Sequence, residues 1–165
     1  MGLYVSGRWY HVALALFDYL VHAMAMKSYP PEVFEAMARC LRDQDDKSQV
    51  WLKSEGYLEL HHLVDAIDGM ELSFRWLVDN GYRPYAAVVD GLNGKDTAKA
   101  WLLKSGYPAL AAFIEATEGS QRAVEFLVKA GEHGWIRVAR ALHQREKKKE
   151  KNFFWSLLNF GNPFR

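Results

Sequence analysis

The chain has 165 residues, of which half are apolar and 14% are aromatic, and its formal net charge is +1. A chain of this length and apolar content can form one domain with a sizeable core, which excludes a mainly disordered protein. Cys40 is the single cysteine, so the sequence excludes an intramolecular disulfide and disfavours a disulfide-stabilised secreted domain. We expect a cytoplasmic protein in which Cys40 is a buried structural thiol.

The charge is unevenly distributed along the chain. Residues 137–165 contain eight Lys or Arg against two Glu, whereas residues 1–136 contain 13 Lys or Arg against 18 Asp or Glu. The sequence therefore predicts an acidic body with a basic C-terminal end. Because an acidic body repels phosphate, we do not expect nucleic acid as a partner.

The first predicted element lies in residues 1–28. The run from Val12 to Met26 is the most apolar stretch, but Asp18 and His22 interrupt it and it is too short to span a bilayer. It also lacks the flanking residues of a secretory signal. We predict one long helix from Trp9 to Met26 that caps the N-terminal end of a helical repeat.

An internal repeat with a period of 25 residues covers most of the remaining chain. Its members share an aromatic–leucine pair and a glycine five residues after the aromatic residue. These are Trp51-Leu52 with Gly56, Trp76-Leu77 with Gly81, Trp101-Leu102 with Gly106, and Phe126-Leu127 with Gly131. Several positions agreeing at one fixed spacing indicate a repeat architecture. We predict an all-α fold, a short α-solenoid of antiparallel helical hairpins.

The domain boundaries follow from this spacing. We predict a repeat domain over 1–144 and a basic helix extension with an aromatic tail over 145–165. The repeat domain consists of the N-terminal cap, a degenerate unit and four repeats. Their ranges are 1–28, 29–45, 46–70, 71–95, 96–120 and 121–144.

The third repeat shows how one unit is expected to fold. Asp96 is predicted to cap the first helix, and Gly106 is predicted to end it in a left-handed conformation. Pro108 suits the first turn of the second helix, and Gly119 ends that helix. We expect the tryptophan of each unit to be the main buried contact between hairpins, so that Trp101→Ala costs about 3–5 kcal/mol.

Tyrosine follows the first glycine in three units, at Tyr57, Tyr82 and Tyr107. Two interpretations stay open. The rings pack locally after the helix-ending glycine, or they form an aromatic ladder for an extended partner, a use that suits a rigid amphipathic side chain. These three residues are candidate partner-binding residues.

The segment 145–165 differs from the repeats. A basic run, Lys147–Lys151, precedes six large apolar side chains within residues 153–160. We expect so much apolar surface to be buried, by folding back on its own domain, by docking into a partner or a second copy, or in a membrane interface. The candidate partner-binding residues here are Phe153, Phe154, Trp155, Leu158 and Phe160.

Catalytic motifs are missing from the sequence. It contains neither a nucleophile elbow nor a complete phosphate-binding loop. Glu59 and His62 have the Glu-x-x-His spacing of di-metal bundles, and His61 and Asp65 lie four residues apart, but no second Glu-x-x-His occurs. We therefore assign no catalytic, cofactor-binding or metal-ligating residue and expect the histidines to pack or to be solvated.

The sequence favours a non-enzymatic scaffold or adaptor that binds a protein or peptide, because helical repeats present extended binding surfaces. The alternative is a peripheral membrane or assembly protein that uses residues 145–165 as its anchor or for self-association. A metal-dependent activity around Glu59, His62 and Asp65 is the third and most remote reading.

Overall fold

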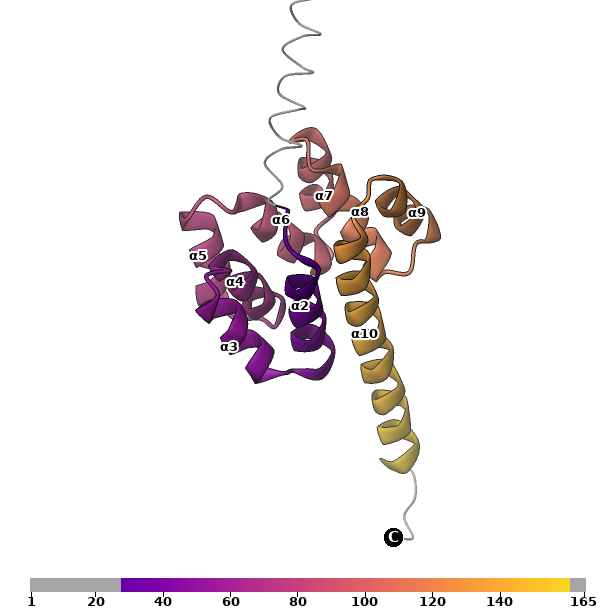
Figure 1. Cartoon of the computed structure of the whole chain (residues 1–165). Coiled ribbons are helices and arrows are strands. Elements are labelled where there is room, and N and C mark those ends of the chain that lie inside the picture. Colours follow the sequence, from indigo (N-terminus) through magenta and orange to yellow (C-terminus); the bar gives the residue numbers. More distant parts are fainter. Residues whose placement is uncertain (1–27, 161–165) are drawn as a thin grey trace, which may run out of the picture.

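The computed structural model describes residues 28–160, with side chains up to residue 152, and this part of the chain is entirely helical (Figure 1). The expected all-α class is confirmed over these residues. Apart from Ser28, the predicted cap lies outside them. The helices are α2 (Pro31–Asp43), α3 (Asp46–Ser54), α4 (Leu58–Ile67), α5 (Glu71–Asp79), α6 (Arg83–Leu92), α7 (Asp96–Lys104), α8 (Pro108–Thr117), α9 (Gln121–Lys129) and α10 (His133–Phe160).

Glycine ends the short helices, as expected, and α7 shows how. Gly106 has a φ of 84°, a left-handed conformation that costs glycine no steric strain. The backbone N–H of Gly106 donates a hydrogen bond to the Leu103 carbonyl at 3.3 Å. The backbone N–H of Tyr107 donates to the Leu102 carbonyl at 2.8 Å. This is the Schellman arrangement, which satisfies the last carbonyls of the helix. Pro108 is the first residue of α8, as predicted.

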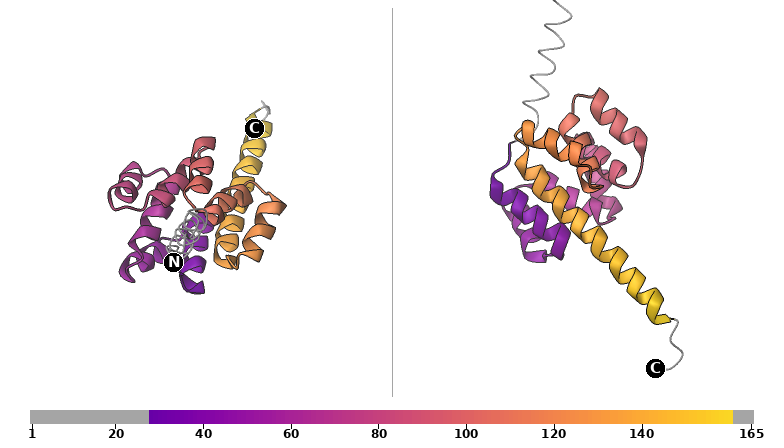
Figure 2. Two further views of the ribbon diagram at one scale, coloured as in Figure 1. Left: turned by 90° about the horizontal axis from the view of Figure 1, so that it is seen from above. Right: turned by 90° about the vertical axis from the view of Figure 1, so that its right-hand side faces the viewer.

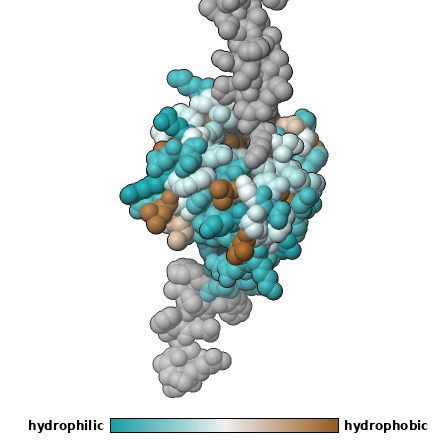
Figure 3. Space-filling model, turned by 60° about the vertical axis from the view of Figure 1, so that its left-hand side comes forward, coloured by the Kyte–Doolittle hydropathy of each residue, from teal (hydrophilic) through white to brown (hydrophobic). Residues whose placement is uncertain are grey.

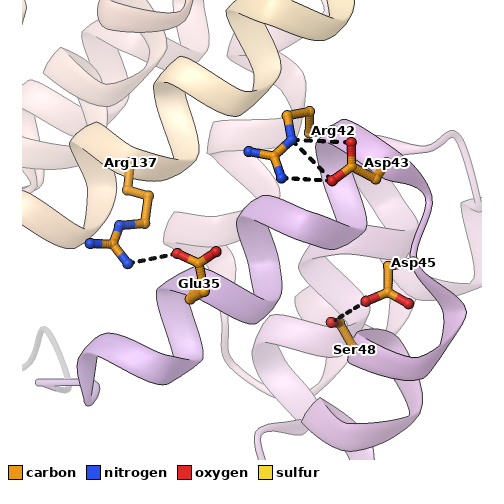
Figure 4. Close-up of polar contacts among 6 residues, drawn as sticks. All are labelled: Glu35, Arg42, Asp43, Asp45, Ser48 and Arg137. Atoms are coloured by element: carbon orange, nitrogen blue, oxygen red, sulfur yellow. Dashed lines mark hydrogen bonds and ion pairs between the residues drawn. The ribbon is translucent and has the colours of Figure 1, made fainter.

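Helix starts agree less well with the prediction. Asp45 caps α3, accepting from the backbone N–H of Lys47 at 3.2 Å and from the Ser48 hydroxyl at 2.6 Å (Figure 4). Asp96 does not cap α7, because it is the first helical residue and Lys95 occupies the cap position without a side-chain hydrogen bond. The carboxylate of Asp96 still favours this end, since the helix dipole is positive there.

The even-numbered helices form a closed ring. Helix α4 packs against α6, α6 against α8, α8 against α10, and α10 returns to pack against α2, which also contacts α4. The odd-numbered helices lie outside this ring, and among the described helices each touches only the two that precede and follow it in the chain. Within residues 28–160, no two outer helices contact each other. Figures 1 and 2 show α10 lying beside α2 and extending beyond the other helices.

The core fills the inside of the ring. Trp135 of α10 is 1% exposed and lies against Phe34, Tyr85 and Phe113, with ring centroids 5.0–6.1 Å away. Each aromatic–leucine pair contributes its leucine to this core. These leucines are Leu52, Leu77, Leu102 and Leu127, all fully buried.

In the third and fourth repeats, the aromatic partner is not the buried contact between hairpins that the sequence suggested, whereas Trp51 and Trp76 are half-buried against the core. Trp101 is 40% exposed and Phe126 is 43% exposed. The physical reason is that successive outer helices do not touch within the described residues, so no neighbouring outer helix covers Trp101 or Phe126. The prediction that Trp101 is a core residue is therefore wrong.

Polar contacts and close packing join the last inner helix to the first. Arg137 of α10 donates to Glu35 of α2 at 2.7 Å (Figure 4). Gly134 lies one helical turn before Arg137 on α10. A Cβ added to it would lie 2.2 Å from the Phe34 ring, so only glycine permits α10 to approach α2 this closely. Further along α10, Arg145 donates to the Leu41 carbonyl at 3.2 Å.

Candidate functional site

Each tyrosine of the repeat lies against the tryptophan six residues before it, stacked for Tyr82 and Tyr107 and tilted for Tyr57. The ring centroids of Trp51 and Tyr57 lie 6.0 Å apart, those of Trp76 and Tyr82 lie 5.7 Å apart, and those of Trp101 and Tyr107 lie 6.5 Å apart. All three tyrosines are half-buried. The structure thus places these predicted partner-binding residues against the tryptophans of their own units.

Most of the exposed large apolar side chains lie on the outer helices, although Leu58 of α4 and Met70 before α5 are exposed as well. Trp101 and Leu103 lie on α7, Phe126 and Val128 on α9, and Val78 on α5, and all are exposed. Figure 3 shows separate hydrophobic areas on a mainly hydrophilic face. Isolated exposed apolar residues are ordinary, but large aromatic ones are the residue type that anchors protein interfaces.

Trp76 and Trp101 differ in what covers them. The imidazole of His62 stacks on Trp76, with centroids 4.1 Å apart and planes at 25°. In the next unit, the position equivalent to His62 is Ala87, whose side chain has no ring that could stack on Trp101. Trp101 therefore keeps more of its indole accessible, and sequence reasoning missed this residue because it assigned the whole column to the core.

A polar cluster lies where α3, α4 and α5 meet. Asp65 of α4 accepts hydrogen bonds from Gln49 of α3 and from the Ser73 hydroxyl of α5, the latter at 3.1 Å. The same hydroxyl lies 3.1 Å from Nδ1 of His62. His61 brings its Nε2 to 3.5 Å from the Asp65 carboxylate. His61 and Asp65 thus converge as their spacing allows, and Gln49 and Ser73 join them from neighbouring helices.

The hydrogen bonds set the protonation of His62. The Ser73 hydroxyl has one proton, which it gives to the Asp65 carboxylate, so it accepts from the Nδ1–H of His62. The Nε2 of a neutral His62 then keeps its lone pair. Burial, with the neighbouring His61, lowers the pKa of His62 below its usual value, which favours this neutral form.

Glu59 does not join this cluster, so the Glu-x-x-His pair does not converge on one site. Its carboxylate is 2% exposed and accepts a hydrogen bond from the Tyr29 hydroxyl at 3.0 Å. The Tyr29 and Tyr85 hydroxyls are also 3.0 Å apart. Burial raises the pKa of both tyrosines above the usual range, so their hydroxyls stay protonated. This buried network was not predicted, because its members are far apart in sequence.

The C-terminal candidates Phe153, Phe154, Trp155, Leu158 and Phe160 lie on α10, and their side chains are outside the described residues. The start of the basic segment is held to the body, since Arg145 pairs with Asp68 of the α4–α5 turn. No helix in the described part of the chain is long and apolar enough to cross a membrane.

A cavity of about 570 Å³ lies beside this basic segment. Arg145, Lys149 and Glu150 of α10 line it together with Glu118, which follows α8. On its wall, Nδ1 of His143 lies 2.9 Å from the Thr117 carbonyl. Because charges of both signs line it, the cavity does not favour an anion or a cation.

Comparison with protein-family models, with curated proteins and with solved structures gave no match.

Proposed function

We propose that the chain is a non-enzymatic protein-interaction module, a short α-solenoid that binds a protein or peptide partner through the exposed aromatic side chains of α7 and α9. The single observation that carries this proposal is the exposure of Trp101 and Phe126 at equivalent places of two neighbouring units. Truncation of large aromatic side chains causes the greatest losses of affinity in protein interfaces.

The helix positions support the repeat architecture on which this proposal depends. Helices α3, α5, α7 and α9 begin at residues 46, 71, 96 and 121, and α4, α6, α8 and α10 begin at 58, 83, 108 and 133. Equivalent side chains of successive units therefore recur around the ring. Because α10 packs against α2, the inner helices enclose the core, and we assign binding to the outer face instead of a concave inner groove.

Site-specific photocrosslinking in the native host tests this assignment. A photoreactive amino acid replaces Leu103, an exposed residue on the same helix as Trp101, in the unmodified chain and in the Trp101→Ala/Phe126→Ala variant. We expect crosslinks to a defined partner that the double variant loses, because truncation of an interface anchor costs about 2 kcal/mol or more, roughly 30-fold in affinity.

Glu125→Ala is the matched control, since Glu125 is exposed on α9 next to Phe126. It should leave the crosslinks unchanged. Crosslinks that are identical in the unmodified chain and the double variant would rule out Trp101 and Phe126 as anchors.

A second candidate is peripheral membrane binding through α10. It is favoured by the continuity of that helix, which runs from the core through Lys147–Lys151 to Phe160 without interruption. Basic residues beside apolar ones suit an anionic membrane surface. In flotation with vesicles containing phosphatidylserine, the full chain should float and a variant with all four lysines of this run changed to Gln should not. Absence of both proteins from the vesicle fraction would remove this candidate.

A further inference from the structure

The polar cluster on α4 has the chemistry and the spacing of a metal site. Two imidazoles and one carboxylate, from His61, His62 and Asp65, each bring a donor atom to within 4.8 Å of the other two. His61 and Asp65 are four residues apart and so share one face of the helix, and His62 is adjacent. This donor set of nitrogen and oxygen suits Zn²⁺ and its first-row neighbours better than Mg²⁺ or Ca²⁺, which prefer oxygen alone.

Two distances in the cluster agree with coordination of one ion. The 3.5 Å between Nε2 of His61 and the Asp65 oxygen is long for a hydrogen bond. It is close to the distance of about 3.4 Å between two ligand atoms of a tetrahedral zinc ion. The His61 and His62 ring centroids lie 5.1 Å apart with planes at 66°. Two imidazoles on one tetrahedral zinc ion would have centroids roughly 5 Å apart.

Surrounding residues hold the donors in place. Gln49 and Ser73 both donate to Asp65, and Trp76 fixes the plane of His62 by stacking on it. Such outer contacts orient metal ligands and support their affinity. The side chains of His61 and Asp65 are 14% and 26% exposed, so the cluster is shielded but can be reached from solvent.

The ring nitrogens of His61 make no hydrogen bond of normal length with the described residues. Its Nδ1 is buried and has no hydrogen-bond partner among the residues that the structure describes. Among the described side chains, the one polar contact of its Nε2 is the long one to Asp65. Nε2 of His61 can therefore serve as a metal donor, because its contact to Asp65 is longer than a hydrogen bond.

We infer that His61, His62 and Asp65 bind one divalent transition-metal ion, Zn²⁺ by preference, with Ser73 and Gln49 as supporting residues. Three protein ligands leave at least one position for water or for a donor from a partner. The repeats after residue 70 do not have this set, because Ala86, Ala87 and Asp90 take the equivalent positions in the next unit.

Titration of the untagged full chain with Co²⁺ and then Zn²⁺ tests the site. We expect one Co²⁺ per chain with visible absorption bands of a nitrogen–oxygen site, and displacement of that Co²⁺ by one equivalent of Zn²⁺. His61→Ala and Asp65→Asn should weaken binding at least tenfold. Ser73→Ala, which keeps all three ligands, should weaken it about 10–100-fold. His133→Ala is the control, since His133 is exposed on α10 and outside the cluster.

Circular dichroism of each variant shows whether its helices persist. A second measurement uses the unmodified chain alone, so its result does not depend on whether the variants fold. In NMR spectra of the histidine rings, Zn²⁺ should shift the signals of His61 and His62 and leave those of His133 and His143 in place. Absence of saturable binding, equal loss in the His133→Ala control, or ring shifts confined to other histidines would each overturn the inference.

Discussion

The Trp135 indole packs edge-on against the Phe34 ring, with centroids 5.5 Å apart, and this contact joins the last inner helix to the first. The two residues are separated by about a hundred positions in the sequence. Their contact lies where α10 returns to α2, the most extensive helix pair in the described chain. The closed ring therefore depends on how tightly these two helices approach.

Gly134→Ala should destabilise the protein although alanine is the better helix former. The new Cβ would lie 2.2–2.5 Å from three atoms of the buried Phe34 ring, so α10 or the ring must move. Overpacking of this kind costs about 1–3 kcal/mol. Urea unfolding followed by circular dichroism measures the free energy of unfolding. Arg140→Ala, at an exposed position on the same helix, should change it by less than about 0.5 kcal/mol. A stabilised Gly134→Ala would contradict the close approach.

Neighbouring residues of the third repeat should differ sharply in their contribution to stability. Leu102 is fully buried, so Leu102→Ala should cost about 2–5 kcal/mol. Trp101 is 40% exposed and loses less buried area, so Trp101→Ala should cost about 1–2 kcal/mol. Paired urea titrations give both values. A Trp101→Ala cost equal to or above that of Leu102→Ala would restore the tryptophan as a core residue.

The fold was predictable from sequence where local chemistry decides it. The end of α7 at Gly106 and the start of α8 at Pro108 depend on backbone conformation within a few residues, and both were predicted. The exposure of Trp101 depends instead on whether two outer helices touch, which a repeat pattern does not encode. The closure of α10 on α2 is also a long-range contact, so the periodic sequence gave no signal for it.

The candidate site was predictable in part for the same reason. The spacing of His61 and Asp65 on one helix was visible in the sequence, but Ser73 reaches them from α5 through the packing of two hairpins. Glu59 was grouped with His62 by its spacing, yet it lies on the buried face of α4 and serves the core. The roles of the residues in a motif on one helix can therefore be assigned only when the packing of the neighbouring helices is known.

Cys40 should react slowly with thiol reagents in the native protein. The side chain is 1% exposed, and burial, with the nearby Asp45, raises the pKa of its thiol to about 12. Since the thiolate is the reactive form, a pKa three units above the usual value leaves about 1,000-fold less of it at pH 8. Labelling with dithionitrobenzoate should be at least about 100-fold slower than in urea-unfolded chains. Equal rates in the two states would show that Cys40 is accessible.

The buried network of Tyr29, Tyr85 and Glu59 should be important for stability. Tyr29 donates to the Glu59 carboxylate, so its oxygen accepts the proton of Tyr85. Tyr29→Phe removes the middle hydroxyl and both of these hydrogen bonds, and should cost about 1–3 kcal/mol, because hydrogen bonds to buried charged groups are among the strongest. Tyr85→Phe removes only the outer bond and should cost less.

Thermal unfolding of the two variants and of Tyr82→Phe separates the hydroxyl effect from ring packing. Tyr82 is half-buried and stacks on Trp76 and Tyr85 through its ring, which phenylalanine retains. The Tyr82→Phe substitution should therefore change the melting temperature little. The expected order of melting temperatures is Tyr82→Phe above Tyr85→Phe above Tyr29→Phe. If Tyr29→Phe melts at the same temperature as Tyr82→Phe, the hydrogen bond to Glu59 contributes no net stability, and the carboxylate is satisfied by its other contacts.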